Sequence, residues 1–171
     1  MEWQIAELVG LVGVAASLIF VALELRQNTI ATKAATNSAY TDAARDFSLA
    51  VATSPELARS LAEWPANPED ATGVDQVQVL GFMRALFHMW SNGHRQYRDR
   101  TLDPSLMDAL RHEISSFALG ASDDPVMVQR AQMLNFAWSI ERFLFPTPFQ
   151  HFVDDLLACG GTARPVDATS R

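Results

Sequence analysis

The stretch Leu8–Leu23, LVGLVGVAASLIFVAL, decides how the N-terminal part of this chain folds. It holds 16 uncharged residues between Glu7 and Glu24. As a helix it covers about 24 Å, somewhat less than the ~30 Å hydrocarbon core of a bilayer. Four apolar neighbours lengthen it towards the size of a membrane span: Trp3, Ile5, Ala6 and Leu25. No polar stripe at helical spacing interrupts the run, which predicts a helix that is apolar on all sides.

Three interpretations of this segment compete. We favour a membrane anchor, because a helix that is apolar on all sides needs lipid or a large core around it. A buried core helix of a soluble domain is the second, since the run is short enough for one. A cleaved signal peptide is the third, but its leading region should be basic, and Glu2 and Glu7 precede this run without any Lys or Arg. Sequence alone leaves open whether residues 5–25 span a bilayer or pack in a soluble core.

The charges beside the segment bear on its orientation. Arg26 and Lys33 follow the run, whereas only the terminal amine precedes it. The positive-inside rule therefore predicts a cytoplasmic C-terminal part, and the lone Cys159 agrees with a reducing compartment.

Small residues recur along one face of the apolar segment. They are Ala6, Gly10, Gly13 and Ser17, at spacings of four, three and four. Small side chains let membrane helices approach closely, so this face is a candidate helix-packing surface for a second copy or another membrane protein. The alternative is that glycine is simply frequent in such helices.

The composition of the whole chain bounds its class. With 171 residues, 49% of them hydrophobic and 19% charged, it has the size of about one domain and is too apolar for a disordered chain. The net charge of -7 argues against a nucleic-acid partner, which would need a basic face. A single cysteine excludes an internal disulfide and a multi-cysteine zinc site.

The remainder of the chain is predicted to be helical. Glu24–Thr53 contains no Gly or Pro, so the apolar helix should continue and become amphipathic. Pairs of a capping residue and a proline then mark helix starts at Ser54-Pro55, Asp103-Pro104, Asp124-Pro125 and Thr147-Pro148. With breakers at residues 65–68, Gly120 and Gly160-Gly161, the helices are expected at 55–64, 74–99, 104–119, 125–145 and 148–158.

These elements predict an all-α fold in which an N-terminal transmembrane helix continues into a small helical bundle. The expected divisions are an anchor helix over 1–25, a helical domain over 26–160 and a disordered tail over 161–171.

No catalytic motif accompanies this architecture. The glycine-rich phosphate loops are missing, and His112-Glu113 lacks the second histidine of a zinc motif because Ser116 stands in its place. His151, Asp154 and Asp155 share a helix face, which we interpret as a polar face rather than a metal site. We therefore expect no cofactor, no metal and no enzymatic activity.

One polar stripe on the helix 74–99 is a candidate anion-binding or partner face. It consists of Arg84, His88, Asn92 and Arg95, at spacings of four, four and three. The favoured interpretation is the solvated edge of a mostly buried helix. The basic patch formed by Arg95, Arg98 and Arg100 follows it, and anionic lipid or an acidic partner would suit that patch.

The chain resembles a group of uncharacterised bacterial membrane proteins. The likeness is carried by SLIFVALELRQNT at 17–29 and ATKAAT at 31–36, with weaker matches at Gln96–Arg98, Leu102-Asp103, 145–149 and 152–154. In that group an apolar N-terminal helix ends in a Leu/Ile-Arg-Gln-Asn-Thr motif and precedes a small helical domain. Glu24 departs from the neutral amide expected there. The resemblance implies one pass through a bacterial inner membrane and brings no activity or catalytic residues.

Two functions follow as hypotheses. The first is a membrane-anchored structural or interaction protein, such as a scaffold or accessory subunit that docks a membrane protein or itself. The second is a soluble helical oligomer or ligand-binding module, whose N-terminal helix is buried.

Overall fold

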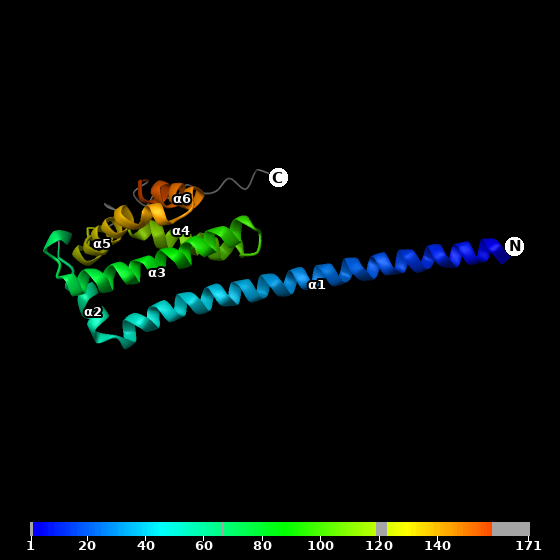
Figure 1. The fold of residues 1–171 in the computed structure, drawn as a ribbon, viewed down its shortest axis with the longest axis horizontal. Coiled ribbons are helices and arrows are strands. Elements are labelled where there is room, and N and C mark those ends of the chain that lie inside the picture. The colour runs from blue at the N-terminus through cyan, green and yellow to red at the C-terminus, as the bar shows by residue number, and fades with distance from the viewer. Residues whose placement is uncertain (1, 66, 119–122, 159–171) are drawn as a thin grey trace.

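The computed structural model describes residues 2–65, 67–118 and 123–158, and these residues form helices with no strand among them. The helices are α1 (Glu2–Thr53), α2 (Pro55–Ala62), η1 (Pro68–Asp70), α3 (Gly73–Arg98), α4 (Pro104–Ser116), α5 (Pro125–Glu141), η2 (Arg142–Leu144) and α6 (Thr147–Ala158). The predicted all-α fold, a long apolar N-terminal helix leading into a bundle, is confirmed (Figure 1).

Helix α1 is a single uninterrupted rod of 52 residues, which is about 78 Å long. It has no break at residue 25, so the expected anchor and domain share one helix. Every residue from 10 to 35 is exposed, and the rod projects away from the bundle (Figure 1). Its apolar part is long and apolar enough to cross a membrane, and none of the qualifying window is buried inside the chain.

The bundle begins where Tyr40 of α1 meets α3. Tyr40 is buried, and its ring lies against Gly93. Seven residues further along α1, Phe47 packs edge-on against Phe82 of α3 with ring centroids 5.4 Å apart. Moving along α1 from Tyr40 to Phe47, the contacts on α3 move back from Gly93 to Phe82. The two helices are therefore antiparallel. The far end of α3 consequently returns towards the exposed part of α1 (Figure 1).

The hydrophobic core forms around the middle of α3. Phe87 and Trp90 are fully buried there. Phe87 stands edge-on to Trp138 of α5 at 5.1 Å between ring centroids, and Trp138 stands edge-on to Phe149 of α6 at 5.8 Å. Aromatic pairs in this geometry add to the burial energy of their large apolar surfaces.

Three of the four predicted helix caps are present. Ser54, Asp103 and Asp124 each accept a backbone N–H in the first turn of the helix that follows, with proline at its start. The fourth helix starts one residue earlier than expected, because α6 includes Thr147. There the carbonyl of Pro146 accepts the N–H groups of Phe149 and Gln150.

Two helices end before their predicted limits for the same physical reason. Helix α2 ends at Ala62 rather than at 64, and α5 ends at Glu141 rather than at 145. Trp64 precedes Pro65, and Phe145 precedes Pro146 in an extended conformation with φ −108 and ψ 154. A residue before proline avoids the helical region, which keeps Trp64 and Phe145 out of a helix. Between Glu141 and Phe145 the chain forms the 3-10 turn η2 instead of continuing α5.

Helix α4 also stops early, at Ser116 rather than at 119, with Phe117 as its C-terminal cap. The expected breakers at Gly120 and Gly160-Gly161, the lone Cys159 and the expected tail over 161–171 lie outside the described residues.

Candidate functional site

The predicted polar stripe of α3 divides into two parts. Arg84 is held by an ion pair: its Nε and Nη2 donate to the two carboxylate oxygens of Glu141 at 2.7 and 2.6 Å. Glu141 is only 2% exposed, so this pair joins α3 to α5 and compensates a buried charge. His88, Asn92 and Arg95 instead line a cavity further along α3.

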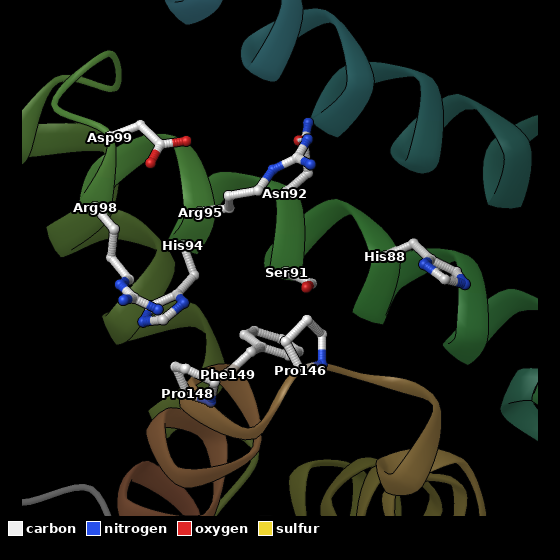
Figure 2. Close-up of a pocket in the computed structure, with 10 residues that line it drawn as sticks. All are labelled: His88, Ser91, Asn92, His94, Arg95, Arg98, Asp99, Pro146, Pro148 and Phe149. Carbon is white, nitrogen blue, oxygen red and sulfur yellow. Dashed lines mark hydrogen bonds between the residues drawn. The ribbon is translucent and has the colours of Figure 1, made fainter.

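That cavity, here called the α3–α6 cavity, has a volume of about 440 Å³. Successive turns of α3 form one wall, and the turn into α6 forms the other (Figure 2). The lining residues are His88, Ser91, Asn92, His94, Arg95, Arg98, Asp99, Pro146, Pro148 and Phe149. Two arginines and two histidines of α3 therefore lie across the cavity from Pro146, Pro148 and Phe149, which are called its floor below.

The local sequence explains both walls. Ser91, His94, Arg95 and Arg98 recur at helical spacing, which puts them on neighbouring turns of α3. The opposite wall exists because Pro146 ends the previous helix and redirects the chain. The ring of His88 then packs against Phe145 at 4.9 Å, and that of His94 stacks on Phe152 at 4.6 Å, both between ring centroids.

The electrostatics of the cavity are positive at its arginine end. Neither Arg95 nor Arg98 forms an ion pair with a carboxylate in the described part of the chain. Arg95 Nη2 donates to Oδ1 of Asn92 at 2.9 Å, which leaves its other N–H groups available. Burial, with the charges of Arg98 and Arg111, lowers the pKa of His94 below its ordinary value. This shift favours the neutral form of His94.

Sequence reasoning identified part of this polar wall: His88, Asn92 and Arg95 in the polar stripe, and Arg98 in the basic patch. It missed Ser91 and His94, which lie one row further round the helix. The signal for that row was the i, i+3, i+7 spacing of Ser91, His94 and Arg98. The floor at 146–149 depends on tertiary packing, which no local pattern reveals.

A second cavity, of about 560 Å³, lies among α1, α2, α3, α4 and α5 and is mostly apolar. Glu113 and Arg130 are its charged residues. The apolar walls remove water from the Glu113 carboxylate and raise its pKa above the ordinary value, although Trp90 and Arg130 partly oppose this. Burial, and secondarily the charge of Glu113, raises the pKa of the neighbouring Tyr40 phenol.

Two predicted surfaces remain: the polar face of α6, whose Asp154 is bound within the chain, and the small-residue face of α1, which is open. Asp154 accepts from Nε and Nη2 of Arg142 and from Nε1 of Trp138, the latter at 2.9 Å, so it acts as a structural anchor for α6. On α1, a Cβ added at Gly10 or Gly13 would meet nothing within 4 Å. The Ser17 hydroxyl donates to the carbonyl of Gly13 at 2.9 Å within its own helix, and the side chain of Ala6 lies outside the described ones.

Comparison with known proteins finds no counterpart: no protein-family model, curated protein or solved structure matches this chain. Among the described residues, no group of three or more His, Cys, Asp or Glu is arranged to hold a metal ion. The α3–α6 cavity and the bare apolar half of α1 are therefore the features on which a function can be based.

Proposed function

We propose that this chain is a single-pass protein of a bacterial inner membrane, whose cytoplasmic helical bundle has a scaffold or accessory role rather than a catalytic one. The bilayer is its first partner, and the second is another membrane protein or a second copy of the chain. The surfaces available for such contacts are the small-residue face of α1 and the part of the α3 stripe formed by His88, Asn92 and Arg95.

The observation that carries this proposal is the exposure of the apolar half of α1. Leu11, Leu18 and Phe20 are 67%, 66% and 65% exposed, and no other helix in the described part of the chain lies over them. Each Å² of apolar surface left in water costs about 25 cal/mol, so a bare helix of this kind requires lipid or a protein cover. A bilayer covers all its sides at once, which suits a helix that has no polar face.

The distribution of positive charge supports a cytoplasmic bundle. Arg26 and Lys33 follow the apolar segment directly. Because α3 runs antiparallel to α1, its last turn carries Arg95 and Arg98 back towards the same end of the bundle. Positive residues on this side favour retention in the cytoplasm next to anionic headgroups.

Cell fractionation with charged variants tests the proposal. The full chain should stay in the membrane pellet after alkaline carbonate extraction. The double variant Val14→Arg/Leu18→Arg should lose that behaviour, because each arginine at a span centre costs about 2.5–3.5 kcal/mol on insertion scales. The matched control is Ile30→Arg/Ala34→Arg, which adds the same charges to exposed positions of α1 beyond the span.

Two outcomes would reject the proposal. If the unmodified chain is extracted by carbonate, α1 is covered by protein, and the soluble oligomer is the correct alternative. If a reporter fused after Arg171 works only in the periplasm, the orientation is reversed.

A further inference from the structure

We propose that the α3–α6 cavity binds a phosphate group carried by an organic molecule, either a soluble phosphoester or a phospholipid headgroup. This inference rests on the geometry of the cavity, and only its lipid form rests on the proposed membrane location.

The first argument is the pair of arginines without carboxylate partners. Arg84, Arg111 and Arg142 of the bundle pair with acids of their own chain. Among the described residues, no ion pair holds Arg59, Arg95, Arg98, Arg100 or Arg130, although the chain carries 20 acidic residues against 13 basic ones. Of these five, Arg95 and Arg98 line the same cavity. Two cationic groups that stay unpaired at one cavity in an acidic protein make a local positive potential, which attracts an anion.

The second argument is the arrangement of donors around the cavity. Figure 2 shows Arg98 beside His94 at one edge, Arg95 beside Asn92 at another, and the Ser91 hydroxyl nearer the middle. These donors lie at separate edges of the cavity, and the tetrahedral oxygens of a phosphate can accept from more than one edge, whereas a flat carboxylate is satisfied by a single guanidinium. A neutral His94 contributes a further N–H without adding charge.

The third argument is the volume of the cavity together with the apolar surface of its floor. A volume of about 440 Å³ exceeds what a bare phosphate ion fills, and Phe149 with Pro146 provides an apolar surface opposite the arginines. The cavity therefore fits an ester with an organic part. Asp99 lines the same cavity on the Arg95 side (Figure 2), and among the described residues its carboxylate forms no ion pair with either arginine.

The distance between the α3–α6 cavity and the apolar segment of α1 supports a phospholipid as the source of the phosphate group. The backbone N–H of Asp103, in the loop after α3, donates to Oδ1 of Asn37 at 3.0 Å. Asn37 is 12 residues beyond Leu25, so this loop lies about 18 Å along the helix from the end of the apolar segment. Arg98 ends α3 and Arg100 lies within this loop, so both positive charges are at this end of the bundle.

Titration calorimetry on the full chain in dodecyl maltoside, a detergent without phosphate, tests the inference. One arm adds glycerol 3-phosphate, and the other adds phosphatidylglycerol in mixed micelles. We expect saturable binding in at least one arm, and Arg95→Gln/Arg98→Gln should weaken it by tenfold or more. The control Arg45→Gln/Arg59→Gln removes the same charge at exposed positions outside the cavity lining and should change affinity less than twofold.

The outcomes distinguish the two sources of the phosphate group from each other and from results that overturn the inference. Binding of glycerol 3-phosphate identifies a soluble ester, and binding of phosphatidylglycerol alone identifies a lipid headgroup. Binding in neither arm overturns the inference, as does an equal loss in the two double variants, which would indicate nonspecific charge attraction. Carbonate extraction is a separate assay, so a failure of the membrane assignment remains distinguishable from a failure of this site.

Discussion

Gly93 sets how closely α3 approaches α1. A Cβ added there would lie 2.6 Å from Cε2 of the buried Tyr40 ring, closer than van der Waals contact permits. Gly93→Ala should therefore destabilise the bundle, because overpacking costs about 1–3 kcal/mol while alanine returns only ~1 kcal/mol of helix propensity. The control is Gly81→Ala on the same helix, where the added Cβ meets nothing within 4 Å. Urea unfolding followed by circular dichroism should show Gly93→Ala less stable, and Gly81→Ala more stable, than the unmodified chain.

A second residue-scale prediction concerns acid. Hydrogen bonds from Arg142, and to a lesser degree from Trp138, hold the pKa of Asp154 below its ordinary value. A depressed carboxyl pKa contributes stability that is present above the ordinary carboxyl pKa of about 4 and is lost as the pH falls below it through the lowered pKa. Because both side chains are partly exposed, we expect a contribution of about 1 kcal/mol or less. Asp154→Asn should lower the urea midpoint at pH 7 and reduce its fall between pH 5 and pH 3. An unchanged acid profile would contradict this role.

At the scale of elements, local chemistry accounts for most helix starts and tertiary structure for several ends. The side chains of Ser54, Asp103 and Asp124 cap their helices as the sequence predicts, because capping needs only neighbouring backbone. The cavity floor at Phe149 and the pairing of Arg84 with Glu141 were not predictable, since each joins segments more than 50 residues apart.

The small-residue face of α1 remains a prediction, and it belongs to this scale. Replacing Gly10 and Gly13 by Leu should weaken self-association of the anchor in a membrane reporter assay. Backbones that meet through small residues gain close van der Waals contact, and two leucines would hold them apart. Ser17 adds little, since its hydroxyl already donates to its own helix. The control Val12→Leu/Ala15→Leu changes the opposite face and should preserve association. Equal association in both variants would remove any packing role for the glycines.

At the scale of the whole molecule, α1 has an exposed apolar half and a second half that packs against the bundle. Residues 10–35 are exposed in the isolated chain, while packing against α3 begins near Tyr40. The sequence predicted a boundary at residue 25, because the apolar run stops there. Only this change in the polarity of the side chains supports that position. The contact that starts the bundle lies further along, where Tyr40 finds space beside Gly93, and that depends on α3 returning antiparallel.

Two truncations test whether the bundle is independent of the anchor. Deleting residues 2–25 removes no buried side chain among those described, so the remaining chain should be soluble without detergent and keep a cooperative thermal transition. Deleting residues 2–48 instead removes Tyr40 and Phe47, which would uncover Phe82 and the second cavity, so this chain should aggregate or melt without cooperativity. Circular dichroism and size exclusion measure both. If the shorter deletion aggregates like the longer one, the apolar half of α1 contributes to a core shared between chains, and the bundle is not an autonomous unit.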